Sequence, residues 1–273
     1  MNNQGKLEAA RLYVGEADIE LDAYDFPIGQ IAVAVAACYD KPGAGEDAAA
    51  LIPVGTDRLV LAVADGVGGL PTGRRASNTA VSRLSDALRN VTEDAERPRT
   101  AILDGMEAAN KELCGLGTGS ATTLVVADIQ DQMVRTFHVG DSSAWLVGQR
   151  GAIKFQTTPH SPVGFAVEAG LIDAKDALDH DDLHVITNVI GSSEMRIEMS
   201  TPTPIAELDT LLLASDGLFD NLLPDEIIEI IRKGPLDEAM NYIWELAAKR
   251  MQGDDDGKPS KPDDFSAILF RLS

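Results

Sequence analysis

The sequence predicts an α+β fold with mostly antiparallel sheets. Three observations lead to this prediction: apolar runs of strand length open the chain, segments with helical spacing occur in pairs between strands, and no stretch of linker composition divides the 273 residues. Length alone allows one or two domains, and the missing linker favours a single domain, residues 1–273.

The expected strands are short runs rich in small and β-branched residues. Residues 30–39 form the clearest early run, and residues 11–22 alternate loosely enough to be an opening strand. The remaining candidates are 48–53, 59–64, 121–127, 134–139, 145–147, 153–156, the run that starts at Thr210, and 266–272.

Apolar residues three or four positions apart predict the helices. The predicted helices are 72–91, 98–113, 224–232 and 236–251. Between them, residues 159–200 are irregular, with short amphipathic pieces at 163–171 and 174–178, which is typical of an inserted flap. The Gly, Pro and Asp content of residues 252–262 predicts a polar, mobile loop.

Aspartates stand at the ends of several predicted strands. Three apolar runs lead into an aspartate and a fourth follows one, and these residues are Asp65, Asp141, Asp216 and Asp263. The stretch around Asp65-Gly66, taken alone, favours a simple hairpin turn. If the carboxylates meet in one place, however, their repulsion requires bound cations, and hard divalent cations prefer oxygen ligands. Metal is then the simplest explanation.

Composition excludes several kinds of partner. The chain has 44 acidic and 23 basic residues and a formal net charge of −21, which repels nucleic acid and anionic membranes. Cys38 and Cys114 follow no disulfide or zinc spacing and predict buried thiols in a reducing compartment. No apolar run reaches the ~18 residues of a membrane span, and the first residues lack the apolar core of a secretion signal. We expect a cytoplasmic protein.

Six short motifs occur in order along the chain. They are Glu46-Asp47, Asp65-Gly66-Val67-Gly68-Gly69, Gly119-Ser120-Ala121-Thr122, Gly140-Asp141-Ser142, Ser215-Asp216-Gly217 and Asp263-Asp264-Phe265-Ser266. Each motif is weak alone, but the six in this order and spacing resemble the metal-dependent protein phosphatase 2C family. Residues 160–191 also resemble the flap of its bacterial members, and the resemblance covers roughly residues 38–272.

The resemblance implies a central β-sandwich of two mostly antiparallel sheets flanked by helix pairs, a four-layer α/β/β/α arrangement, with the flap at about 159–200. It also implies two Mn²⁺ or Mg²⁺ ions in a cleft, with a third, weaker site. The residues that match the family's metal ligands are Asp65, the carbonyl of Gly66, Asp216, Asp263 and, for the third ion, Asp141. Glu46 matches the residue that positions metal-bound water, so Asp65, Asp216 and Glu46 are the catalytic candidates.

The implied reaction is hydrolysis of phosphoserine and phosphothreonine in proteins by a metal-bridging hydroxide, opposed by a Ser/Thr kinase. Two metals about 3.5–4 Å apart acidify water and neutralise the phosphoryl oxygens, so no protein nucleophile is needed. Two alternatives stay open: a catalytically weak pseudophosphatase that acts as a regulatory binding module, and a phosphomonoesterase for small molecules.

Some positions depart from the family pattern. Val67 stands where many members carry a histidine that donates a proton, and Pro42 stands where many carry an arginine that grips phosphate. Lys41 is the candidate substitute for that arginine, although a lysine lacks its bidentate geometry. Leu183 and His184 replace the usual Arg and Asn of the flap.

Other assignments stay open at this level. Asp264 is an alternative to Asp263, and Asp47 is either a site residue or a solvated one. Arg74 and Arg75 are alternatives to Lys41 as the residue that binds the substrate phosphate.

Overall fold

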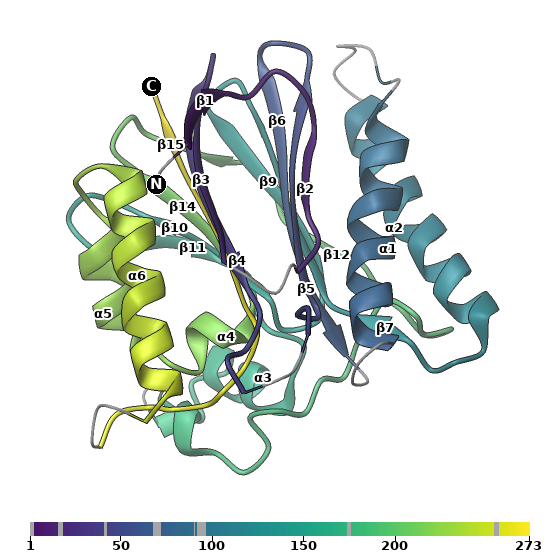
Figure 1. The fold of residues 1–273 in the computed structure, drawn as a ribbon, viewed down its shortest axis with the longest axis vertical. Coiled ribbons are helices and arrows are strands. Elements are labelled where there is room, and N and C mark those ends of the chain that lie inside the picture. The colour runs from purple at the N-terminus through teal and green to yellow at the C-terminus, as the bar shows by residue number, and fades with distance from the viewer. Residues whose placement is uncertain are drawn as a thin grey trace.

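The computed structural model describes residues 3–15, 19–40, 43–67, 72–89, 91, 97–173, 176–253 and 257–273. Two sheets stack face to face, and a pair of helices covers the outer face of each (Figure 1). The predicted fold class, an α+β sandwich in four layers, is confirmed.

The first sheet is ordered β1-β3-β4-β15-β14-β10-β11. Its strands are β1 (Asn3–Lys6), β3 (Glu20–Phe26), β4 (Gly29–Ala36), β10 (Ser143–Val147), β11 (Ile153–Gln156), β14 (Thr210–Ala214) and β15 (Phe265–Leu272). β15 lies in the middle of this sheet, antiparallel to both β4 and β14. The pairing of β1 with β3 is parallel.

The second sheet is ordered β12-β9-β8-β6-β5-β2, with β13 paired to β9 and β7 paired to β6 off this path. Its strands are β2 (Arg11–Tyr13), β5 (Asp47–Val54), β6 (Arg58–Val67), β7 (Ala121–Thr122), β8 (Leu124–Gln130), β9 (Met133–Val139), β12 (Glu198–Met199) and β13 (Thr203–Pro204). Neighbouring strands of this sheet run antiparallel.

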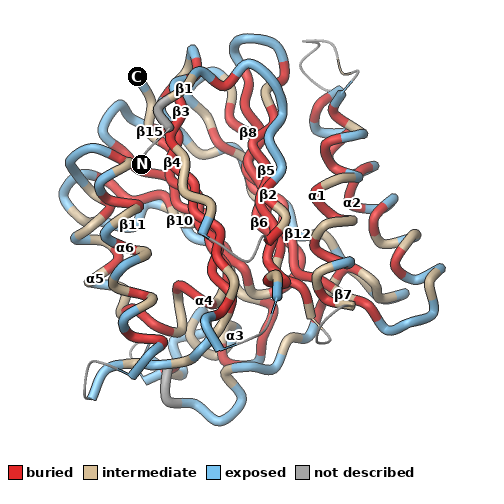
Figure 2. Tube along the Cα trace, in the orientation of Figure 1, coloured by how far each residue is buried: buried red, intermediate tan, exposed pale blue. Residues whose placement is uncertain are grey.

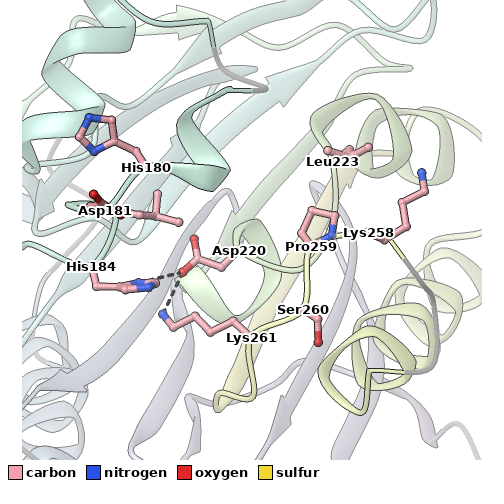
Figure 3. A pocket seen from close by; sticks show the side chains of 11 residues that line it. His180, Asp181, His184, Asp220, Leu223, Lys258, Pro259, Ser260 and Lys261 are labelled. Carbon is pink, nitrogen blue, oxygen red and sulfur yellow. Dashed lines mark hydrogen bonds and ion pairs between the residues drawn. The ribbon is translucent and has the colours of Figure 1, made fainter.

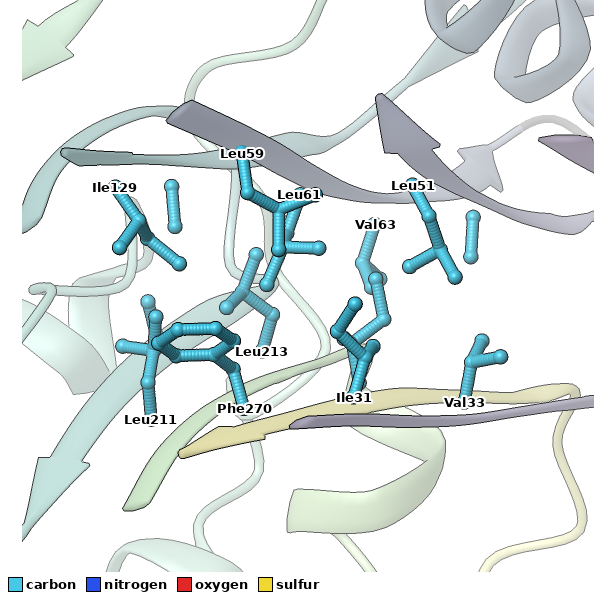
Figure 4. Packing of buried hydrophobic residues seen from close by; sticks show 14 of the residues in the cluster. Ile31, Val33, Leu51, Leu59, Leu61, Val63, Ile129, Leu211, Leu213 and Phe270 are labelled. Atoms are coloured by element: carbon cyan, nitrogen blue, oxygen red, sulfur yellow. The ribbon is translucent and has the colours of Figure 1, made fainter. Parts of the chain in front are cut away.

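The main hydrophobic core lies between the two sheets. Successive residues of a strand point to opposite faces, so Leu59, Leu61 and Val63 of β6 face the first sheet, while Val60 and Ala62 face the helices. Figure 4 shows the inward-facing side chains of β6 opposite those of β4, β14 and β15.

Helices cover both outer faces, and Figure 2 shows that their buried residues face the sheets. The helices α1 (Thr72–Leu88) and α2 (Arg97–Leu116) pack on the second sheet, and α5 (Pro224–Ile231) and α6 (Leu236–Met251) pack on the first. Small residues on the outer face of the second sheet, such as Ala48, Ala50, Ala62 and Ala64, meet α1. None of the described helices is long and apolar enough to cross a membrane.

Three short helical segments lie toward one end of the sandwich. The helix α3 (Pro162–Glu168) and the 3₁₀ helix η1 (Asp176–Asp179) lie in residues 159–200, the segment predicted to form a flap, and α4 (Asp216–Phe219) directly follows β14. Ser161 caps α3 by accepting a hydrogen bond from the amide of Gly164 at 2.9 Å. The close packing of α4 against the start of β15 requires Gly217, because a Cβ there would collide with the carbonyl of Asp264.

One expected strand is wrong. Residues 11–22 do not form a single strand, because β2 pairs with β5 in the second sheet while β3 pairs with β4 in the first. Gly15 lies between them with φ 69°, a left-handed conformation that breaks an extended run.

Candidate active site

Strand ends from both sheets meet at one end of the sandwich. Asp47 at the start of β5 pairs in register with Asp65 near the end of β6. In the first sheet, Ala214 at the end of β14 pairs with Ala267 of β15 and with Ser143 of β10. Asp216, Asp263 and Asp141 lie just beyond these paired residues, so the register brings all of these predicted carboxylates to one end.

Two buried carboxylates tie the sheets together at this end. The Asp47 Oδ2 atom accepts hydrogen bonds from the Ser215 and Ser266 hydroxyls, both at 2.7 Å. Asp264 accepts backbone hydrogen bonds from Cys38 at 2.7 Å and from Glu46 at 2.9 Å. Burial, with the charge of Asp264, raises the pKa of Asp47 well above its ordinary value, while the two serine hydroxyls oppose the shift. Asp47 is therefore a buried structural carboxylate, and the idea that it is merely solvated is wrong.

Three further carboxylates share one ammonium group. The Lys261 Nζ atom lies 2.6 Å from Asp216, 2.8 Å from Asp220 and 3.0 Å from Asp263, in each case measured to Oδ2. Burial opposes the charge of Lys261, but the three carboxylates outweigh it and raise the lysine pKa. These oxygens converge on a point that suits a cation.

Asp65 and Asp141 carry raised pKa values. Burial is the main cause for both, followed by the charge of Asp47 for Asp65 and of Asp216 for Asp141. The pKa of Asp141 rises to about 7, and that of Asp65 rises well above its ordinary value. The Asp141 Oδ1 atom is buried and has no hydrogen-bond partner among the described residues.

Glu46 and Gly66 adjoin these carboxylates through the backbone. The Gly66 amide donates to the Glu46 carbonyl at 3.2 Å, and Glu46 is 7 % exposed. A Cβ at Gly66 would collide with the backbone of Gly73, and a Cβ at Gly73 would collide with the Glu46 Oε1 atom. Glycine at both positions therefore lets α1, β6 and the Glu46 side chain approach closely.

These residues fit a divalent cation centre. A carboxylate cluster of this density needs positive charge, and the buried, unpartnered oxygen of Asp141 offers a ligand atom. The lysine ammonium marks a point where Asp216 and Asp263 already converge. Hard cations such as Mg²⁺ bind through a few carboxylates and several waters. Of the two adjacent aspartates, Asp263 faces that point, whereas both oxygens of Asp264 accept backbone hydrogen bonds.

A large pocket opens beside the cluster, between the flap and residues 257–261. Its volume is about 890 Å³, and Asp220 and Lys261 form part of its wall. Lys261 and His184 both point toward Asp220 (Figure 3), with the His184 Nδ1 atom 3.7 Å from the carboxylate. Lys41 lies outside the described residues, and the Arg74 guanidinium donates to the Val14 carbonyl at 3.4 Å.

A second group of possible ligands, His138, His160 and Glu198, has ring nitrogens and a carboxylate oxygen within 4.8 Å of one another. The His160 Nδ1 atom accepts from the Gly140 amide at 3.0 Å and from Asn188 at 2.9 Å, so its Nε2 atom carries the proton and faces Glu198 at 3.3 Å. Neither nitrogen of His160 then keeps a lone pair for a metal. This group is a hydrogen-bond network at the base of the flap.

Sequence reasoning missed Asp220 and Lys261. The Asp220 amide donates to the Asp216 carbonyl at 2.7 Å, so the two side chains lie one helical turn apart on the same face. A predicted helical turn after β14 would therefore have placed Asp220 beside Asp216. Lys261 has no comparable local signal. It lies in the loop predicted to be mobile. There its backbone amide donates to the Asn221 side chain at 2.8 Å, and its carbonyl accepts from the same side chain at 2.9 Å.

The sequence model of the family described as protein phosphatase 2C matches residues 38–252. The serine/threonine phosphatase stp of Listeria monocytogenes serotype 4b is 34 % identical over 183 residues, which are 64 % of this chain and 71 % of that protein.

Solved structures share the fold. A Streptococcus agalactiae serine/threonine phosphatase superposes with a TM-score of 0.78 at 23 % identity, covering 90 % of this chain and 100 % of its own. The catalytic domain of the phosphatase PstP, solved in complex with two manganese ions, superposes with a TM-score of 0.70 at 22 % identity, covering 90 % of this chain and 98 % of its own. From the family match and the Listeria relative, the chain belongs to the protein phosphatase 2C family, and the predicted enzyme class, a protein phosphatase, is confirmed.

Proposed function

We propose that this chain removes phosphate from phosphoserine and phosphothreonine in proteins, with two Mn²⁺ or Mg²⁺ ions in the cleft and a third, weaker ion beside them. The observation that carries the proposal is the convergence of Asp65, Asp141, Asp216 and Asp263 from separate strand ends. The manganese ions in the related PstP structure support the choice of metal.

Each residue has a role in this proposal. Asp65, the Gly66 carbonyl, Asp216 and Asp263 hold the two ions, and Asp141 with Asp220 faces the third. When bound, the ions supply an acidified water and neutralise charge on the phosphoryl oxygens. The Glu46 carboxylate, held against Gly73, orients water by hydrogen bonding.

Lys261 also has a role, because it occupies the oxygens that the ions require. Its ammonium balances the charges of Asp216, Asp220 and Asp263, and its side chain would have to move aside for an ion to bind the same oxygens. Lysine suits this exchange because its charge sits on a flexible four-carbon stem.

The surroundings of the cleft set the proposed substrate. With a net charge of −21, the protein repels phosphorylated molecules except where cations invert the local sign, so binding depends on the loaded cleft. The wide pocket at the flap leaves room for a protein segment. A Ser/Thr kinase would supply the phosphorylated substrate.

Phosphate release from phosphoserine and phosphothreonine peptides, measured with Mn²⁺ or Mg²⁺ and again with EDTA, tests the proposal. We expect turnover that depends on metal. Absence of turnover on every phosphate ester would favour a pseudophosphatase. Faster cleavage of small phosphomonoesters than of peptides would favour a small-molecule enzyme. Lys41, the predicted phosphate grip, is tested by Lys41→Ala, for which we expect a higher KM for the peptides.

A further inference from the structure

A second, apolar pocket adjoins the carboxylate cluster. Its volume is about 310 Å³. We call it the flap pocket, and its apolar wall includes Trp145, Val163, Val167, Leu183, Phe219 and Leu222. The wall combines the flap helix α3 with β10 and the segment that begins at α4, and the rings of Trp145 and Phe219 pack with centroids 4.8 Å apart.

The flap pocket and the proposed metal cleft are continuous. Asp141, Asp216 and Asp220 line the flap pocket as well as the cleft. Consecutive Cα atoms are about 3.8 Å apart in any peptide. A phosphorylated residue bound at the carboxylates therefore places the side chain of its neighbour in the sequence within reach of the apolar wall.

Size and charge define what the flap pocket can hold. Its volume is at the bottom of the range for pockets that bind whole small molecules, about 300–1,000 Å³, so one large side chain is a suitable occupant. Glu168 and the three aspartates in its lining repel an acidic side chain. An aliphatic or aromatic side chain instead loses apolar surface to the wall, which favours binding.

We propose that the flap pocket receives an aliphatic or aromatic side chain next to the phosphorylated residue of the substrate, and so determines which phosphoproteins are hydrolysed. This inference rests on the proposed function, because it places the phosphoryl group at the carboxylates. Val167 and Trp145 are then specificity-determining residues that take no part in the chemical step.

Phosphopeptides that differ in one flanking residue, Leu, Phe, Ala or Glu, on either side of the phosphoserine test this inference. We expect kcat/KM for Leu or Phe to exceed that for Ala by about 10- to 200-fold on at least one side, the range for methylene groups in an apolar pocket. The difference should lie in KM, since the contact is present before the chemical step. Equal values for Leu and Ala, or a preference for Glu, would overturn the inference.

Two variants of α3 locate the effect. Val167→Phe fills the flap pocket and should abolish the preference for Leu over Ala while leaving hydrolysis of the Ala peptide unchanged. Phe165→Leu is the matched control, because Phe165 lies on the same helix, is 45 % exposed and does not line the flap pocket. Val167→Ala enlarges the flap pocket and should shift the preference toward Phe. If Val167→Phe keeps the Leu preference, the flap pocket is not its cause.

A binding experiment separates this inference from the proposed function. The chain has two tryptophans, so Trp244→Phe leaves Trp145 as the reporter. Peptides carrying a non-hydrolysable phosphonate should change Trp145 fluorescence at lower concentration with a Leu flank than with an Ala flank. If the phosphonate peptides bind with this preference but the matching phosphopeptides are not hydrolysed, the proposed function alone is overturned. If the phosphopeptides are hydrolysed but show no preference for a Leu flank, only the inference about the flap pocket is overturned.

Discussion

Two groups of carboxylates at the cleft have their charge balanced by different means. Asp47 accepts hydrogen bonds from two serine hydroxyls, and Asp264 accepts hydrogen bonds from two backbone amides. We call these two residues the hydrogen-bonded pair. Asp216, Asp220 and Asp263, the lysine-bridged set, share one ammonium. Both groups contain buried or partly buried acids, so burial alone does not distinguish them.

The difference separates structural from exchangeable charge. The hydrogen-bond donors to Asp47 and Asp264 lie within strands or directly beside strand ends, so they are fixed by the fold. The Lys261 ammonium comes from a loop on a flexible stem, so an arriving divalent ion can replace it. We infer that the hydrogen-bonded pair holds the sheets together and that the lysine-bridged set is reserved for cations.

Asp216→Ala tests whether the lysine-bridged set binds cations, and it should have the largest effect of these variants. We expect turnover to fall by well over 100-fold, because even groups that only support metal ligands contribute about 10- to 100-fold. Circular dichroism should show an intact fold. Asp57→Ala is the control, since Asp57 is exposed in the turn at the opposite end of β6. Normal turnover in Asp216→Ala at saturating manganese would remove Asp216 from the site.

Asp47→Ala tests whether the hydrogen-bonded pair holds the sheets together. Removing the acceptor leaves two buried hydroxyls without their partner, so the free energy of unfolding should fall by about 2 kcal/mol or more. Asp47→Asn keeps an acceptor oxygen and should be milder, because the raised pKa shows that this site disfavours charge. Urea denaturation in EDTA measures both variants. Equal losses would mean that the serine contacts contribute little.

Stability against pH tests whether cations balance the cleft. Folding raises the pKa of Asp141 and Asp220 to about 7, so between about pH 4 and pH 7 the folded chain binds protons that the unfolded chain does not. The contribution of these groups to stability is present at low pH and is lost as the pH rises through 7. In EDTA, Tm should therefore fall from pH 5 to pH 8. Added manganese favours the ionised carboxylates and should remove this fall. A fall unaffected by manganese would contradict metal binding here.

Lys261→Met sharpens the comparison with a smaller effect. Without the competing ammonium, manganese should bind more tightly by a factor on the order of ten, which is about 1.4 kcal/mol. Isothermal titration calorimetry measures this change. Lys258→Met is the matched control, because Lys258 lies in the same loop but contacts Glu226 at 3.4 Å. Equal affinities in the two variants would show that Lys261 does not compete with metal.

Sequence reasoning located those site residues whose signal is local. Asp65 and Asp216 each follow an apolar run, and Asp263 precedes one, so each was identified without knowledge of the fold. Antiparallel register places the end of β6 beside the start of β5 and the end of β14 beside the start of β15. The packing of one sheet on the other then brings Asp65 close to Asp216 and Asp263.

The remaining contacts depend on long-range packing, which leaves no local pattern. Lys261 reaches the cleft because its backbone pairs with Asn221, 40 residues away. Asp220 directly follows α4 as its C-cap residue, and the four residues of α4 are too few to show helical periodicity. The alternation over residues 11–22 predicts one strand because it does not reveal that the two halves of the segment enter different sheets.

The central position of β15 also affects how the protein matures during synthesis. A nascent chain that has reached residue 262 contains Asp65, Asp141 and Asp216, but it lacks Asp263 and the strand that joins β4 to β14. Because the ribosome delivers residues in order, the first sheet stays split until β15 emerges. We therefore expect incomplete chains to lack phosphatase activity, and phosphate removal to begin only once β15 has left the ribosome.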